Sequence, residues 1–157
     1  MKQREVGEAY EASTSALEAA KGQRLSLRRA IAGLEEALAA PDGRDALPAR
    51  LGPALERLGE VFAVHVEVTE APGGLYQEIL ENAPRLANRV ARFRREHAQI
   101  TAGIGQAVAE CSAATDRASV QALRDHAVRL FADLVRHRKR GLDLVYEAYD
   151  VDIGGES

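Results

Sequence analysis

The sequence has few of the features that hold secreted or membrane proteins together. Its one cysteine, Cys111, excludes an internal disulfide and is typical of a reducing cytosol. The only locally apolar stretch, residues 61–68, is interrupted by a histidine and a glutamate, so no segment is apolar enough to span a bilayer. The N-terminal stretch MKQREVGEAYEAS has neither an apolar core nor a small-residue cleavage pattern. We therefore expect a cytoplasmic protein.

Aromatic residues are also scarce, at 4 %, and neither sign of charge dominates, because the formal net charge is only −3. A nearly neutral chain has no general attraction to nucleic acid. The basic run RHRKR at 136–140 would be spread around a helix axis and has no aromatic residue beside it, which indicates a solvated surface. We expect neither a nucleic-acid partner nor a membrane partner.

The chain is rich in alanine, leucine, glutamate and arginine, which are strong helix formers, and it has no stretch of period-two alternation. Segments with proline, glycine or small polar residues divide it into four amphipathic helices, at about residues 24–40, 49–70, 84–110 and 119–149, with a short helical piece at 75–83. Four such helices joined by short loops predict an all-α, up-down-up-down four-helix bundle.

The 157 residues are enough for one domain. We expect the bundle to cover residues 23–150. An N-terminal extension at 1–22, either frayed or helical, would precede the bundle, and a polar C-terminal tail at 151–157 would follow it. The proline- and glycine-containing segment at 41–48 and the polar segment at 111–119 are expected to be loops.

Three histidines stand where the helical pattern requires an aliphatic core residue. His65, His97 and His137 each continue a series of apolar residues at 3–4 spacing, one series on each of the last three long helices. An imidazole costs free energy to bury unless its nitrogens find partners. Three of them facing one interior indicate a shared metal ion, and they suit a tetrahedral ion such as zinc with water as the fourth ligand. Neutral imidazoles that bond to hydroxyls, buried water or one another are the alternative.

The residues one turn beyond these histidines are not strong ligands. The i+4 neighbour of a core residue lies on the same face of the helix, about 40° away. These neighbours are Thr69, Thr101 and Gly141, which predict a small polar cavity for water, an anion or a small ligand. Among the nearby acidic residues, Glu70 is the best carboxylate ligand if its helix ends irregularly near Pro72.

Four stretches of the chain resemble the hemerythrin-like (HHE cation-binding) family of four-helix bundles. They are LRRAIAGLEEALAAP, FAVHVEVTEAPGGLYQEI with its histidine and its Gly/Pro exit, PRLANRVARFRREHAQI with a Glu-His pair, and LVRHRKRGLDLVYEAY with a further histidine. The resemblance covers about residues 24–150. It implies a non-haem di-iron centre that is bound by five histidines and two bridging carboxylates.

Carried onto this chain, the resemblance makes His65, His97 and His137 metal ligands. The family's other ligand positions fall on residues that are poor ligands, so we expect them to line the site: Ala30, Thr69, Thr101 and Gly141. Members of the family bind oxygen, sense iron or redox state, or handle reactive oxygen and nitrogen species. The resemblance therefore implies iron as the cofactor, as a di-iron or a single-ion site, with zinc or no metal as alternatives.

The leading hypothesis is a protein that binds or senses iron, oxygen or small oxidants through its core histidines. No enzymatic reaction is assigned, because no residues form a nucleophile or a general base. The rival hypothesis is a metal-free hemerythrin-like scaffold that acts as a small-ligand or protein interaction module. The end of the last helix carries Tyr146 and Tyr149 among acidic residues, which favours packing against another part of the chain or a second subunit. A homodimer is therefore an open alternative.

Overall fold

The computed structural model describes the backbone of residues 2–41 and 43–154, and the side chains of residues 16–149 except 42 and 44. Within these residues every regular element is helical, which confirms the all-α prediction. The four long helices are α1 (Lys2–Ala39), α2 (Leu47–Glu70), α4 (Ala87–Ala113) and α5 (Arg117–Gly154). The shorter elements are α3 (Leu75–Asn82) and two 3-10 turns, η1 (Arg44–Ala46) and η2 (Pro84–Leu86).

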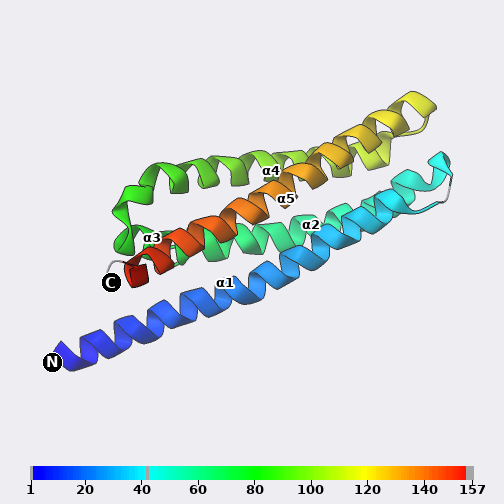
Figure 1. Ribbon diagram of the computed structural model, residues 1–157. Helices are drawn as coiled ribbons and strands as arrows, with labels where there is room; N and C mark the ends of the chain where they lie inside the picture. Colours follow the sequence, from blue (N-terminus) through cyan, green and yellow to red (C-terminus); the bar gives the residue numbers. More distant parts are fainter. Residues whose placement is uncertain (1, 42, 155–157) are drawn as a thin grey trace.

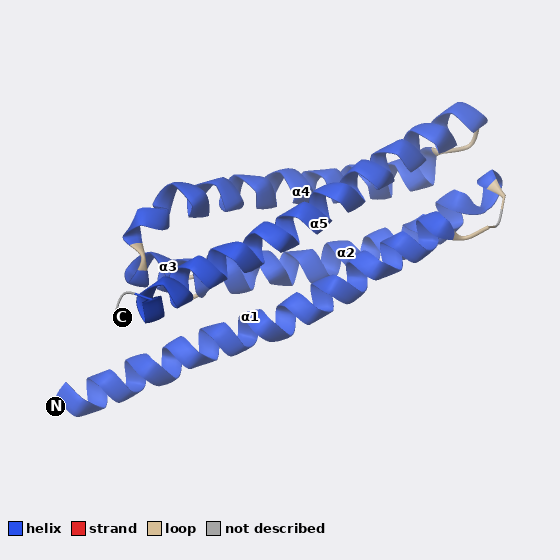
Figure 2. Cartoon of the chain, viewed as in Figure 1, coloured by secondary structure: helices blue, strands red, loops and turns tan. Residues whose placement is uncertain are grey.

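The long helices lie side by side along most of the molecule. α1 and α2 are joined at one end, and α4 and α5 are joined at the same end (Figure 1). The short helix α3 links α2 to α4 at the opposite end, and only short loops separate the helices (Figure 2). Contacts run from α1 to α2, from α2 to α4, from α4 to α5 and from α5 back to α1, so the four helices enclose one interior.

Two helices are longer at the chain ends than the sequence predicted. The backbone of residues 2–22, expected as a separate extension, is continuous with the rest of α1. Residues 151–154 of the expected tail continue α5, whereas 155–157 lie outside the described residues. Residues 2–22 are rich in alanine and glutamate, which favour helix, whereas residues 151–154 directly follow the last turns of α5 and extend them.

The expected loops are shorter in the structure. Part of the segment 41–48 forms η1, and Pro48 lies in the first turn of α2, where its missing N–H leaves no helical bond unmade. α4 continues to Ala113, and α5 begins directly after Asp116. The Asp116 carboxylate accepts a 2.7 Å bond from the Ser119 N–H, and Ser119 Oγ accepts a 3.2 Å bond from the Asp116 N–H. This reciprocal cap fixes the start of α5.

The apolar face predicted for each long helix is buried. On α1 this face consists of Leu27, Ile31, Leu34 and Leu38, and the faces of α2, α4 and α5 continue the same interior. The core forms two apolar clusters, a large one towards the α1–α2 loop and a smaller one around α3. On α2 and α5 the core histidine follows the residues of the large cluster, and on α4 it follows those of the small cluster and precedes those of the large one. The three histidines are therefore the polar layer between two apolar layers.

Candidate metal centre

The structure brings the three predicted histidines together. His65 comes from α2, His97 from α4 and His137 from α5, and their exposed fractions are 9 %, 1 % and 2 %. The Nε2 atoms of His65 and His137 are 3.3 Å apart, and those of His97 and His137 are 3.1 Å apart. One ligand atom from each residue lies within 4.8 Å of the other two. The heptad argument for a shared interior is thus confirmed.

These separations match the size of a coordination shell. Metal–nitrogen bonds of about 2.0–2.1 Å in a tetrahedral site place neighbouring ligand nitrogens about 3.3–3.4 Å apart. The two observed Nε2–Nε2 distances fall at or slightly below that range. Small movements of the side chains would therefore admit one ion between the three nitrogens.

A carboxylate stands behind two of the imidazoles, on the side away from the cluster. Glu96 Oε1 lies 3.0 Å from Nδ1 of His137 and also accepts a 2.8 Å bond from Arg140. Glu70 Oε2 lies 3.4 Å from Nδ1 of His97 but is poorly aligned for a hydrogen bond. The sequence suggested Glu70 as a ligand, yet its oxygen is at the far nitrogen and not among the Nε2 atoms. Carboxylates in this position orient metal-bound histidines and fix their tautomers.

The hydrogen bonds restrict where the protons lie on these groups. A carboxylate only accepts, so His137 carries its proton on Nδ1 and presents a lone pair at Nε2. If His97 does the same towards Glu70, two lone pairs face each other across 3.1 Å. If His97 is protonated on Nε2 instead, its bare Nδ1 faces the Glu70 carboxylate. In the first arrangement a cation at the Nε2 atoms would satisfy both lone pairs, whereas in the second His97 Nε2 donates its proton to His137 Nε2.

Burial keeps the three imidazoles in the neutral form that a metal needs. Desolvation, aided by the neighbouring His137, lowers the pKa of His65 to about 3. Desolvation also lowers the pKa of His97 and of His137, and at His137 the Glu96 carboxylate opposes the shift. Neutral imidazoles are ready to bind metal without first losing a proton.

Aromatic rings close two sides of the cluster. The Phe62 ring lies 5.5, 5.6 and 6.0 Å from the rings of His65, His97 and His137 and forms an apolar wall. The Tyr76 ring stacks on His97 with an interplanar angle of 18°, and its hydroxyl is 3.2 Å from His97 Nε2. Burial raises the pKa of this phenol. Tyr76 is therefore the oxygen donor beside the three nitrogens.

A small cavity of about 40 Å³ adjoins the cluster. His65 and His137 line it, together with Thr69 and Gly141, as the sequence suggested for the last two. A space of this size admits one or a few water molecules. The Thr69 hydroxyl, however, lies 2.9 Å from the backbone oxygen of His65 and is bonded within its own helix. Thr69 therefore shapes the cavity and does not act as a ligand.

Two other residues expected to line the site lie elsewhere. Ala30 is buried in the large apolar cluster and does not border the cavity. Thr101 is exposed and lines a separate hollow between α2 and α4. The reason is that Ile100 and Ile104 follow His97 into the core, which leaves Thr101 on the outer edge of α4. Neither Ala30 nor Thr101 borders the cavity beside the histidines.

Sequence reasoning assigned no role to Glu96. It directly precedes His97, so it points about 100° away from the core position, where a glutamate ordinarily faces solvent. Only the packing of α4 against α5 shows that this direction leads to His137. In the sequence the one signal was the adjacent Glu-His pair of residues 96 and 97.

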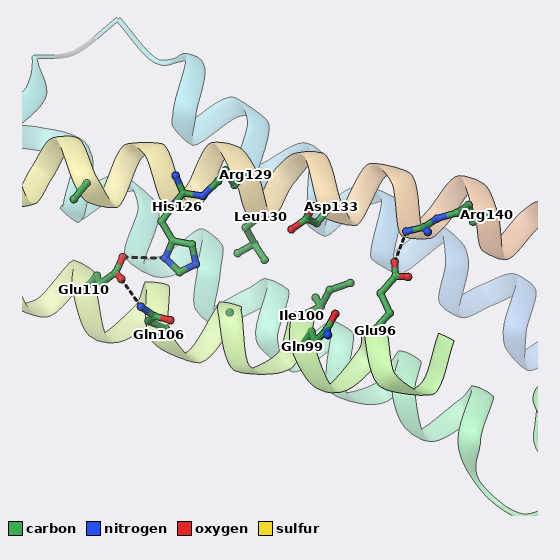
Figure 3. Close-up of a pocket in the computed structure, with 12 residues that line it drawn as sticks. Glu96, Gln99, Ile100, Gln106, Glu110, His126, Arg129, Leu130, Asp133 and Arg140 are labelled. Atoms are coloured by element: carbon green, nitrogen blue, oxygen red, sulfur yellow. Dashed lines mark hydrogen bonds and ion pairs between the residues drawn. The ribbon is translucent and has the colours of Figure 1, made fainter. Parts of the chain in front are cut away.

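A larger hollow of about 600 Å³ runs between α4 and α5 on the outer side of Glu96 (Figure 3). At one end, Glu96 bonds to Arg140, and at the other end Glu110 bonds to His126 at 2.9 Å (Figure 3). Gly103 helps to form its floor. We call this hollow the α4–α5 groove. Glu96 thus touches both the buried histidines and a groove open to solvent.

Comparisons with known proteins add no assignment. No protein-family model, curated protein or solved structure matches this chain. None of the helices in the described part of the chain is both long enough and apolar enough to cross a bilayer. The class of site is therefore defined by geometry alone: a buried group of three histidines that could hold a metal ion.

Proposed function

We propose that the protein is a hemerythrin-like metal-binding protein that holds one non-haem metal ion through Nε2 of His65, His97 and His137. One observation carries this proposal: in the core, Nε2 of His137 lies 3.3 Å from Nε2 of His65 and 3.1 Å from Nε2 of His97, and one ligand atom of each histidine lies within 4.8 Å of the other two. The resemblance of the sequence to the hemerythrin-like family, with its up-down-up-down bundle, supports the same assignment and favours iron.

The geometry favours a single ion over a di-iron centre. Two metals in one bundle need carboxylates that bridge them. Here Glu70 and Glu96 lie at the Nδ1 atoms of His97 and His137, on the outer side of the rings. Imidazole nitrogens suit iron and zinc alike, so the donor set fits either ion.

The role that fits this site is to bind or sense iron, oxygen or a small oxidant inside the cytoplasm. Iron would supply electron exchange and an open coordination position. The chain's own residues orient His137 through Glu96, exclude bulk water through Phe62, and leave a 40 Å³ cavity beside His65 and His137. A cavity of that size selects ligands of only a few atoms.

Metal loading tests the proposal. The purified protein is incubated with ferrous iron under reducing conditions or with zinc, desalted, and its metal content is measured by mass spectrometry. We expect one ion per chain and loss of that ion in His97→Ala. The matched control is His126→Ala, because His126 also bonds to a carboxylate through Nδ1 but lies outside the cluster. Absence of bound metal after both loadings, or equal binding by His97→Ala and wild type, would refute the proposal.

The α4–α5 groove favours a second candidate function, a metal-free scaffold that binds a small polar ligand or a protein. The groove is about 600 Å³ and is lined by charged and amide side chains from both helices. Ligand sites of known proteins have comparable volumes. If metal loading fails, a thermal-shift screen of small polar compounds, repeated with Gly103→Leu to fill the groove, tests this function.

A further inference from the structure

Tyr76 is the one phenol that shares the space of the histidine cluster in the described part of the chain. Its hydroxyl is 3.2 Å from His97 Nε2, which is within the spread of the two Nε2–Nε2 distances. It also borders the 40 Å³ cavity together with His65 and His137. The phenol oxygen therefore lies beside the group, in contact with the ligand nitrogen of His97.

The ring is held firmly in this place. Only 4 % of Tyr76 is exposed, and its ring stacks on His97. Phe93 lies 6.3 Å away, centroid to centroid, and the Arg94 guanidinium lies 5.9 Å from the ring centroid. A side chain confined by contacts on several sides cannot swing away from the cluster without repacking the core.

The backbone before α3 is built for close approach. Gly73 has a φ of +76°, a conformation that favours glycine. A Cβ on Gly74 would lie 2.7 Å from the carbonyl oxygen of Val68 and 2.8 Å from that of Ala71. The two glycines thus let α3 fold back tightly on the end of α2, and this turn brings Tyr76 to the histidines.

We propose that Tyr76 is the fourth protein ligand and that it makes the site a three-imidazole, one-phenolate centre for ferric iron. The inference rests on the proposed function, because it needs a metal at the three histidines. Binding forms one iron–oxygen bond, breaks the phenolic O–H bond and releases that proton to solvent. An anionic oxygen is a harder donor than imidazole and holds ferric iron in other proteins, so it favours the ferric over the ferrous state.

The experiment uses the full chain, loaded with ferrous iron and then oxidised in air. We expect a phenolate-to-iron charge-transfer band in the visible range, and resonance Raman excitation in that band should enhance tyrosine ring modes. Tyr76→Phe should lose the band but retain iron. Tyr149→Phe is the control, because Tyr149 is half-buried on α5 and does not line the cavity beside the histidines. It should keep both the band and the iron.

The possible results of this experiment distinguish failure of the Tyr76 ligand from failure of the histidine metal site. Iron bound by wild type without a visible band or tyrosine Raman modes overturns the role of Tyr76 and leaves the histidine site standing. A visible band that survives in Tyr76→Phe also overturns the role of Tyr76 and leaves the histidine site standing. Failure of wild type to bind any metal overturns the proposed function and the tyrosine ligand together. The Raman spectrum of wild type needs no variant, so the inference stays testable even if Tyr76→Phe does not fold.

Discussion

Removing the Glu96 carboxylate should weaken metal binding without removing any metal ligand. Glu96 Oε1 holds Nδ1 of His137 at 3.0 Å and so keeps the lone pair of Nε2 directed at the cluster. Loss of an outer carboxylate of this kind typically costs about 10- to 100-fold in metal affinity, which corresponds to about 1.4–2.7 kcal/mol. Glu96→Ala should therefore raise the dissociation constant for zinc by that factor, as measured by competition with a chelator.

The fold itself also loses a little stability in Glu96→Ala. The bond to the buried His137 is worth about 1–2 kcal/mol, whereas the exposed ion pair with Arg140 adds at most about 1 kcal/mol. Glu110→Ala is the matched control, because Glu110 makes a similar 2.9 Å contact with Nδ1 of His126 outside the cluster. It should lower the melting temperature to a comparable extent and leave zinc affinity unchanged. Equal zinc affinity in Glu96→Ala and Glu110→Ala would refute the reasoning.

Three further predictions concern the metal-free protein and use urea unfolding. The pKa of His65 is near 3 in the folded chain and near 6.5 in the unfolded chain, so the unfolded state binds more protons as the pH falls. The free energy of unfolding should therefore decrease below pH 6.5, by about 2 kcal/mol at pH 5 from His65 alone. A free energy of unfolding that does not change with pH would contradict this. Leu34→Ala, at a fully buried position, should cost about 2–5 kcal/mol, whereas Leu25→Ala, at a 48 % exposed position, should cost about 0.5 kcal/mol or less. Gly74→Ala should destabilise the fold by about 1–3 kcal/mol, because the new Cβ would lie too close to backbone oxygens. Gly33→Ala, where a Cβ would meet open space, should leave stability unchanged or raise it. The same effect for both variants would contradict the close approach at α3.

The helical period alone was enough to predict the buried faces of the four long helices. Leu34, Leu55 and Leu134 are each fully buried, and each lies on the apolar face read from the sequence. The same period placed His65, His97 and His137 in one interior, because it reports direction around a helix axis. Helix ends were less predictable. The start of α5 depends on the reciprocal bonds between Asp116 and Ser119, a local signal outside the period.

The sequence does not predict how neighbouring helices are placed relative to each other. Whether Glu96 reaches His137 depends on how far α4 and α5 are shifted along each other. The helical period of each sequence contains no information about this shift. Tyr76 depends on the tight turn at Gly73 and Gly74, which folds α3 onto the cluster. Thr101 was misplaced for a related reason, since a 40° offset leads into the site or out of it according to where the next helix lies.

The most direct test of the metal centre is the position of the metal itself. Crystals of the loaded protein, measured on both sides of the absorption edge of the metal, give an anomalous difference map. We expect one peak per chain, about 2.0–2.1 Å from Nε2 of His65, His97 and His137. No peak at these atoms, or two peaks bridged by Glu70 or Glu96, would contradict the single-ion site.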